Sequence, residues 1–253
     1  MVTTTKQWLL AVLERAGYTV IPNWRLAKHP QASYLKLLLK FLDVDCILDV
    51  GANLGQFRDF LRDEVGFDGI IISFEPISDL AQQLQDRAKR DNKWLIKQFA
   101  LGSAEGRAPF NVMASSQFSS FLSPEHSLTP MFLATNVVTR IVDVEIRTLD
   151  AILPELRTQL GFSSVYLKLD TQGFDLEVMK GAGQSLECVR GLQTEVSVTP
   201  IYSGVQRYEA SLPVFESLGF EISGVFPNNP QHFPHLVEFD CHMISRAFLR
   251  RAD

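Results

Sequence analysis

The residues of this 253-residue chain that are best suited to chemistry follow two short apolar runs in its first third. Asp49, Gly51, Asn53 and Gly55 lie in the stretch ILDVGANLGQF, and Glu75 follows the run IIISF. Glycines let a backbone come close to a ligand, and free N–H groups gather where a helix begins. A carboxylate 24 positions beyond Gly51 can accept hydrogen bonds from both hydroxyls of a ribose. Together, these residues indicate a site for an adenosine-containing ligand.

The spacing in the first loop favours one such ligand over another. A dinucleotide fingerprint requires G-x-G-x-x-G, but this loop has no glycine at the middle position, and Gln56 follows its last glycine. Asp49 lies two positions before Gly51, where its charge would repel a diphosphate but could face the amino end of a methionine-like ligand. The pattern therefore favours S-adenosylmethionine over NAD. A structural alternative is that the two glycines only permit a tight turn and that Asp49 caps a helix.

The elements that would hold these residues alternate between strands and helices. CILDV (46–50) is an almost wholly apolar run, typical of a buried parallel strand. Further strands are predicted at IIISF (70–74), WLIKQFAL (94–101), SVYLKLD (164–170) and GLQTEVSV (191–198). Segments with helical spacing follow each of these strands except 94–101, and FEISGVF and VEFDCHMIS add two closing strands. Short crossovers of this kind predict a right-handed parallel sheet. We therefore expect an α/β fold with a doubly wound, mostly parallel, seven-stranded sheet.

The segment between the third and fourth of these strands has a different composition. Residues 114–139 are rich in Ser, Pro and Phe and are interpreted as a loop, and residues 140–150 alternate as a strand does. A loop of this length inside a compact domain is usually a lid or a binding loop. Phe118, Phe121 and Phe132 therefore either close over a substrate or pack the loop onto the sheet.

Two helices are expected before the first strand. The chain is divided accordingly into residues 1–44, N-terminal helices that pack on or near the catalytic domain, and residues 45–253, the domain itself. Trp8 and Leu9 fall on one helical face and either cover the cofactor pocket or form a homodimer contact.

The composition excludes several classes of partner. A net charge of -5 and a pI near 5.6 give no general attraction to nucleic acid or anionic lipid. No segment approaches the roughly 18 apolar residues of a membrane span. Cys46, Cys188 and Cys241 are far apart, which fits reduced thiols better than disulfides or a metal cluster. We therefore expect a soluble, cytoplasmic protein without a metal site.

Longer motifs make the assignment more specific. The motifs DVGANLGQF, SFEP, FALG, RTLD, YLKLDTQGFDLEVMKGA, TEVSVTPIY, LGFEI and EFDCHMISR resemble the FkbM family of S-adenosylmethionine-dependent methyltransferases. The likeness covers about residues 45–246, and KLDTQG, TEVS and EFD are its most specific parts. It implies a Rossmann-like class I methyltransferase fold with an antiparallel last strand. The implied reaction is O-methylation of a hydroxyl on a sugar, polyketide or related metabolite.

The resemblance also implies which residues contact the cofactor. The methionine part would contact Asp49, Gly51, Ala52, Asn53 and Gly55. The ribose would contact Glu75 and Pro76, and the adenine would contact Phe99, Ala100 and Leu101. The chain departs from the family pattern at one point. Members commonly show Gly-Ala-Glu where this chain has Gly173, Phe174 and Asp175, which leaves the role of that position open.

Methyl transfer to a hydroxyl needs a base near the cofactor's sulfur. Asp170 ends the fourth parallel strand and is the first candidate for the base or for a carboxylate that orients the acceptor, with Gln172 beside the substrate. Alternatively, Asp170 caps a helix or contacts the cofactor's amino group. Glu195 is the second candidate for the base, and the alternative is that it is a structural carboxylate. His126 is the third candidate, and the alternative is that it is a solvated histidine in the loop.

His232 lies in a turn before the last strand and could line the mouth of the substrate site, together with Phe118 and Phe121. The expected partner is a small-molecule or glycan acceptor. Two other functions stay open at this stage: a non-catalytic member that binds S-adenosylmethionine, which the departure at Phe174 permits, and an NAD-dependent dehydrogenase, which the missing glycine argues against.

Overall fold

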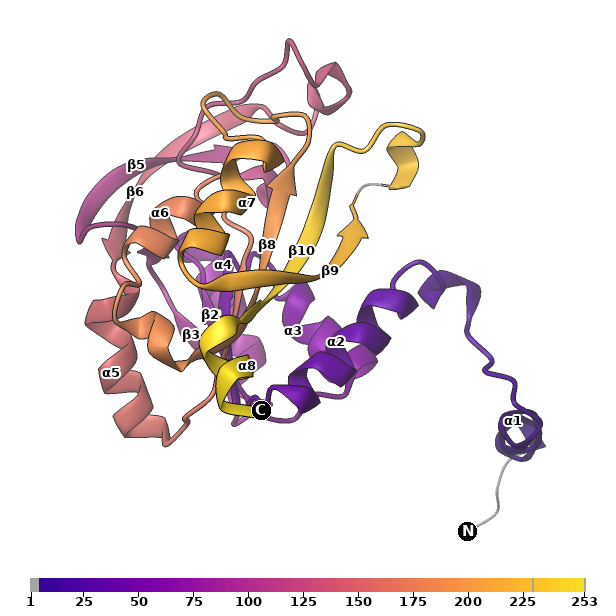
Figure 1. Cartoon of the computed structure of the whole chain (residues 1–253). Helices are drawn as coiled ribbons and strands as arrows, with labels where there is room; N and C mark the ends of the chain where they lie inside the picture. The colour runs from indigo at the N-terminus through magenta and orange to yellow at the C-terminus, as the bar shows by residue number, and fades with distance from the viewer. Residues whose placement is uncertain (1–4, 229, 253) are drawn as a thin grey trace.

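The apolar runs of the sequence form the centre of the molecule. In the computed structural model, which describes residues 5–228 and 230–252, seven strands build one sheet in the order β3-β2-β1-β7-β8-β10-β9 (Figure 1). In chain order these strands are β1 Cys46–Val50, β2 Ile70–Phe74, β3 Trp94–Lys97, β7 Val165–Leu169, β8 Val189–Ser197, β9 Phe220–Pro227 and β10 Glu238–Ser245. The pairs β10–β8 and β10–β9 are antiparallel and the other pairs are parallel, so the expected doubly wound sheet with an antiparallel last strand is confirmed.

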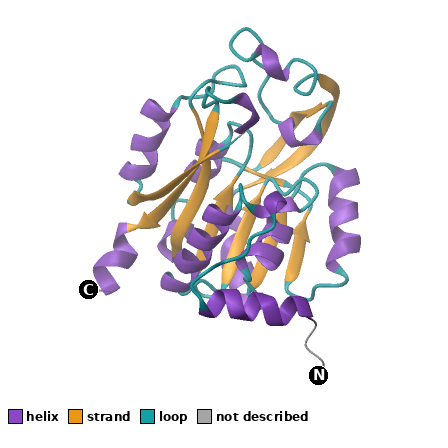
Figure 2. Ribbon diagram, turned by 90° about the vertical axis from the view of Figure 1, so that its right-hand side faces the viewer, coloured by secondary structure: helices purple, strands orange, loops and turns teal. Residues whose placement is uncertain are grey.

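Helices cover both faces of this sheet (Figure 2). One face carries α2 His29–Phe41, α3 Gln56–Phe60 with its continuation η2 Leu61–Val65, and α4 Ser78–Ala88, while the other carries α5 Leu149–Leu160, α6 Asp175–Lys180 and α7 Tyr208–Ser217. Strand β1 shows why two cores form. Leu48 belongs to the core under α5, α6 and α7, whereas Ile47 belongs to the core under α2. Asp49 follows Ile47 on the α2 side, where a charge is unusual.

A second, three-stranded sheet corrects two predictions. The run 94–101 is not one strand: β3 ends at Lys97, and β4 Ala100–Leu101 instead pairs with β6 Val138–Arg147, next to β5 Gly106–Met113. The strand predicted at 140–150 ends at Arg147 because the Thr148 hydroxyl accepts the Ala151 N–H and starts α5. The short turn after β3 thus brings β4 out of the main sheet.

The loop predicted at 114–139 has more structure than expected. It contains the 3-10 turns η3 Ser116–Phe118 and η4 Pro130–Phe132. Phe132 is buried, and its ring centroid lies 5.3 Å from that of Phe118. The Tyr202 hydroxyl donates to the Phe118 carbonyl at 2.8 Å. The loop is therefore packed against the segment that follows β8.

The N-terminal segment has two parts with different surroundings. Helix α2 packs on the sheet through buried leucines such as Leu35 and Leu39. Helix α1 Thr5–Arg15 lies apart from the body in Figure 1, and Trp8 is 63% exposed. After β10 the chain continues into α8 Arg246–Ala252. No helix in the described ranges is long and apolar enough to cross a membrane.

Candidate active site

A cavity of about 480 Å³ opens at the carboxyl ends of the parallel strands, where α/β sheets bind ligands. Its walls come from the turns after β1, β2 and β7, from the strands β4, β8 and β10, from the loop between β5 and β6, and from the start of α2. Most residues that the sequence predicted for a site line it: Gly51, Ala52, Asn53, Glu75, Pro76, Ala100, Leu101, Phe118, Phe121, Asp170, Gln172 and Glu195.

Three residues predicted to contact a cofactor lie outside the cavity lining. Asp49 is fully buried one layer deeper, where its carboxylate accepts from Lys168 Nζ at 2.9 Å and from a serine hydroxyl. A Cβ on Gly55 would meet Leu84, so this glycine serves helix packing. Phe99 packs against Phe74, with ring centroids 5.7 Å apart. Asp49, Gly55 and Phe99 therefore support the cavity from behind its lining, and direct cofactor contacts by these residues stay a prediction.

Two predicted histidines also lie outside the lining. His126 Nε2 lies 2.7 Å from the Asn136 carbonyl, so this ring braces the loop between β5 and β6. The His232 ring packs on Phe132 at a centroid distance of 5.0 Å. The roles of His126 as a base and of His232 at the substrate mouth stay predictions.

The turn after β1 is shaped by a close backbone approach. Gly51 has φ +82°, and its N–H donates to the Phe74 carbonyl at 3.1 Å. A Cβ at Gly51 would lie 2.0 Å from the Asp170 carbonyl oxygen. Only glycine fits both requirements. The turn therefore sets the position of Asp170 as well as that of its own residues.

Substituting Gly51 with alanine is expected to destabilise the fold by about 2 to 3 kcal/mol, because strain at positive φ adds to the clash with Asp170. Urea unfolding of the variant measures the change. Gly106→Ala is the matched control, since a Cβ there meets no atom within 4 Å. Equal stability of the two variants would contradict this account of the turn.

Glu75 lies next to the turn after β1, and Gly51, Asn53 and Glu75 together form one corner of the cavity. Its two carboxylate oxygens accept the N–H groups of Asn53 and Ile77, each at 2.8 Å, and the residue is 4% exposed. Each oxygen keeps a further lone pair, and the residue lines the cavity. A vicinal diol could donate to both oxygens, so the carboxylate fits the ribose expected from the sequence.

Burial gives Glu75 an unusual titration. It raises the pKa of the carboxyl to about 7, against the lowering effect of the two backbone N–H donors. This pKa exceeds the ordinary value of a glutamate. The contribution of the Glu75 carboxyl to the free energy of unfolding is therefore complete at acidic pH and is lost as pH rises through about 7. Hydroxyl donors prefer the ionised form. Binding of a ribose is therefore favoured above this pH.

The affinity for S-adenosylhomocysteine, the product form of the expected cofactor, should accordingly fall as pH drops below about 7, with a limiting slope of about tenfold per unit. Calorimetric titration at several pH values measures this. Glu75→Gln cannot titrate and should remove the slope. A wild-type slope that persists in that variant would assign the dependence to another group.

A row of polar residues runs across the sheet directly beneath the cavity. Ser73, Asp49, Lys168, Gln193 and His242 are register neighbours on five adjacent strands. Burial disfavours the charge of Lys168, yet Asp170 and Asp49 raise its pKa above the ordinary value. Buried polar groups of this kind are costly unless partnered. The row thus supports the charged residues at the strand ends.

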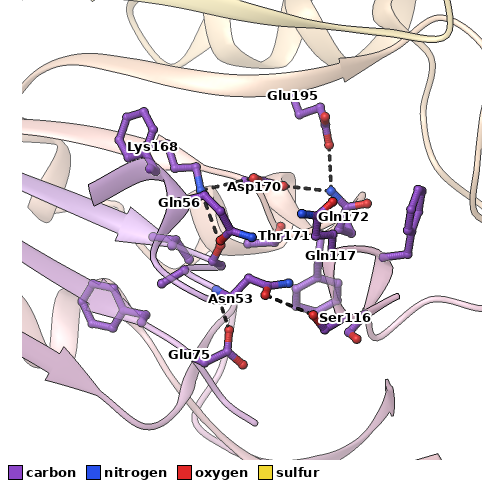
Figure 3. A pocket seen from close by; sticks show the side chains of 18 of the residues that line it. Asn53, Gln56, Glu75, Ser116, Gln117, Lys168, Asp170, Thr171, Gln172 and Glu195 are labelled. Carbon is purple, nitrogen blue, oxygen red and sulfur yellow. Dashed lines mark hydrogen bonds and ion pairs between the residues drawn. The ribbon is translucent and has the colours of Figure 1, made fainter. Parts of the chain in front are cut away.

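The two predicted carboxylates are brought together by Gln172. Its Nε2 donates to Asp170 at 2.8 Å and to Glu195 at 2.9 Å, as Figure 3 shows, and its Oε1 accepts from Tyr202 at 2.7 Å. Gln172 has φ +54°, which non-glycine residues seldom adopt. Lys168 Nζ lies 3.2 Å from Asp170. Gln172 therefore orients both carboxylates toward one space.

The departure at Phe174 and Asp175 has two structural consequences. The Phe174 ring lines the cavity and packs on Phe121 at a centroid distance of 4.6 Å. Asp175 is buried away from the lining and accepts from Thr171 N at 3.0 Å and Thr194 Oγ at 2.6 Å. The phenyl ring shapes the cavity wall, while Asp175 fixes the turn between β7 and α6.

Several lining residues were not predicted from the sequence: Lys28, Gln31, Ser116, Lys168, Gln193, Asn228, Glu238 and Asp240. Lys168 carried a usable signal, because it is a lone charge within the apolar run VYLKL. Glu238 and Asp240 lie within the EFD motif of the last strand, where two acidic residues share one face. No sequence signal could have predicted Gln31, because it contacts Asp240, which is 209 positions away in the chain.

Comparison with known proteins identifies the family. Residues 49–222 match the family described as Methyltransferase FkbM domain. That range includes the turn after β1, Glu75, and the segment carrying Asp170 and Gln172. Among curated proteins, none matches the chain.

Solved structures show distant likenesses. Aeropyrum pernix fibrillarin with natively bound S-adenosyl-L-methionine is 15% identical, with 85% of this chain and 73% of that chain covered and a TM-score of 0.45. Magnesium protoporphyrin IX methyltransferase from Synechocystis PCC 6803, with the same ligand, is 9% identical, with 96% and 98% covered and a TM-score of 0.46. An rRNA methylase from Streptococcus thermophilus is 9% identical, with 90% and 99% covered and a TM-score of 0.43.

At these identities and TM-scores the structural likenesses add nothing to the assignment, which depends on the family match. Because that match spans well over half of the sequence, the chain belongs to the FkbM family of methyltransferases, whose methyl donor is S-adenosylmethionine.

Proposed function

We propose that the protein is an O-methyltransferase that acts on a hydroxyl of a sugar, polyketide or related metabolite. The observation that carries this proposal is the pair of carboxylates, Asp170 and Glu195, which Gln172 joins at the cavity wall. An alcohol is a poor nucleophile until its proton is taken, so a methyl transfer to oxygen needs a carboxylate or a similar base at this place.

The cofactor-binding roles are proposed for the residues that line the cavity near β1, β2 and β4. Glu75 binds the ribose hydroxyls, and Gly51 with Asn53 holds the methionine part. Ala100 and Leu101 form an apolar wall for the adenine. S-adenosylmethionine, when bound, supplies a methyl group on a positively charged sulfur.

Asp170 is proposed as the base. Its side chain is 39% exposed, so it can reach an acceptor, and its backbone is fixed against Gly51. Burial and the neighbouring carboxyls of Glu238 and Asp170 raise the pKa of Glu195 well above its ordinary value. The ionised form that a general base requires is therefore disfavoured at Glu195. Its role is to orient the acceptor together with Gln172.

The proposal predicts that the protein binds S-adenosylmethionine and S-adenosylhomocysteine, but neither NAD nor ATP, in calorimetric titrations. Incubation with S-adenosylmethionine and a panel of hydroxylated acceptors should then release S-adenosylhomocysteine and give O-methyl products by mass spectrometry. Binding of both sulfur ligands without turnover would support a non-catalytic binding role. Methylation at nitrogen or carbon would overturn the assignment to oxygen.

A further inference from the structure

One end of the cavity, between β8, β10 and the start of α2, has an unusual charge balance. Glu195 and Asp240 are direct cross-strand neighbours, and Glu238 lies two residues before Asp240 on the same face. The positively charged residues among the described lining are Lys28, which is exposed, and Lys168, which pairs with other carboxylates. This end of the cavity, called here the β8–β10 compartment, thus has three carboxyls and no buried cation of its own among those residues.

The hydrogen-bond donors around this compartment are already engaged. Asn228 Nδ2 donates to Glu195 at 2.9 Å and to Asp240 at 3.2 Å. Gln31 Nε2 donates to Asp240 at 2.7 Å. The wall that remains toward the cavity is therefore rich in acceptor oxygens, which would bind a ligand that donates.

Gln193 provides an independent sign of such a ligand. It is 5% exposed, lines the cavity, and contacts Asp240 through its side chain. Its Oε1 is buried and has no hydrogen-bond partner. An unpartnered buried acceptor is costly, so its presence requires an explanation such as a bound donor that is absent from the protein itself.

Charge decides what kind of donor fits. Burial raises the pKa of Asp240, and it raises that of Glu238 to about 8, with Asp170 as a further cause in both cases. A neutral hydroxyl would leave this repulsion unchanged, whereas a cation would stabilise the ionised carboxyls. The carboxyls do not converge as metal ligands do, since no group of three or more His, Cys, Asp or Glu within residues 5–228 and 230–252 could hold a metal ion.

We propose that the β8–β10 compartment binds a protonated amine of the methyl acceptor, with Asp240, Glu195 and the Gln193 carbonyl as its partners. The acceptor is then an amino alcohol, such as an amino sugar, whose hydroxyl faces Asp170. This inference rests on the proposed function, because it concerns the acceptor of the same site.

Part of the compartment lies outside the segment that matches the family model. Gln31, Asn228 and Asp240 all lie outside the matched residues 49–222. Gln31 comes from α2, whose first turn is thereby part of the substrate site. Gln31 is a positioning residue, because it reaches the amine only through Asp240.

The test uses two matched pairs of probes: glucosamine with glucose, and ethanolamine with ethylene glycol. Their dissociation constants are measured by NMR titration of the full chain saturated with S-adenosylhomocysteine, whose own binding is checked first by calorimetry. Each amine should bind at least tenfold more tightly than its neutral partner. Asp240→Asn and Gln193→Leu should each reduce that preference to less than threefold, while Asp143→Asn, an exposed carboxylate on β6, should not change it.

Failure of S-adenosylhomocysteine to bind would overturn the proposed function, and with it this inference. Normal binding of that ligand, with no preference for either amine, would overturn the inference alone. The same conclusion follows if folded Asp240→Asn and Gln193→Leu variants both keep the wild-type preference. If Asp240→Asn does not fold, Gln193→Leu decides, because leucine has a similar volume and lacks the carbonyl.

Discussion

Substitution of Glu75 with alanine should weaken binding of S-adenosylhomocysteine by roughly a hundredfold or more. The carboxylate offers one lone pair on each oxygen to the ribose, and hydrogen bonds to a charged group contribute about 1.5 to 3 kcal/mol each. The variant also loses the bonds that hold Asn53 N and Ile77 N, so the turn after β1 relaxes. Calorimetric titration at pH 8, where the wild-type carboxyl is ionised, measures the loss.

Two controls separate binding from folding in this experiment. Glu75→Gln keeps the size of the side chain but removes its charge, and it should bind with intermediate affinity. Glu221→Ala, at an exposed position on β9, should bind as the wild type does. A folded Glu75→Ala protein that retains affinity within threefold would show that the ribose does not lie at this corner.

Substitution of Asp170 with asparagine should lower kcat by about 10² to 10⁴, the range that a positioned general base contributes. Asparagine keeps the size of the side chain and one oxygen that can accept from Gln172, while the oxygen that faces Lys168 is lost. The backbone of the turn stays fixed against Gly51. The affinity for S-adenosylhomocysteine should change by less than about threefold. Single-turnover assays on an acceptor found by the screen, combined with calorimetry, separate the two quantities.

The pH profile of the same variant distinguishes a base from a structural carboxylate. Loss of a base should leave residual turnover that rises with hydroxide concentration, whereas Asp143→Asn should keep the wild-type profile. A large loss of cofactor affinity in Asp170→Asn would instead assign Asp170 to the cofactor's amino group. Full activity in a folded Asp170→Asn protein would move the base to another residue.

The parallel strands were predictable from the sequence because their residues face a core on both sides. CILDV and IIISF were predicted as strands with the boundaries that the structure shows. The corner formed by Gly51, Asn53 and Glu75 was predictable for a similar reason, since those residues immediately follow two adjacent strands. Helix α5 was not predicted, and Pro154 lies inside it, where proline usually argues against a helix.

Side-chain direction, by contrast, depended on the tertiary structure. Asp49 and Phe99 sit next to the cavity in sequence, yet neither lines it, because the Asp49 carboxylate is buried against Lys168 and the Phe99 ring packs on Phe74. The direction of the His126 side chain likewise depended on a contact within its loop, where Nε2 lies 2.7 Å from the Asn136 carbonyl.

By itself, the sequence determined the fold class, the cofactor corner and the carboxylates at the strand ends, because these depend on local patterns and short spacings. Only the tertiary structure decided how Gln31, Gln193 and Asp240 meet, since they come from α2, β8 and β10 and are joined by strand pairing and packing over long separations. The compartment proposed to bind the acceptor is therefore assembled by the whole fold, whereas the corner proposed to hold the cofactor is encoded in two short segments.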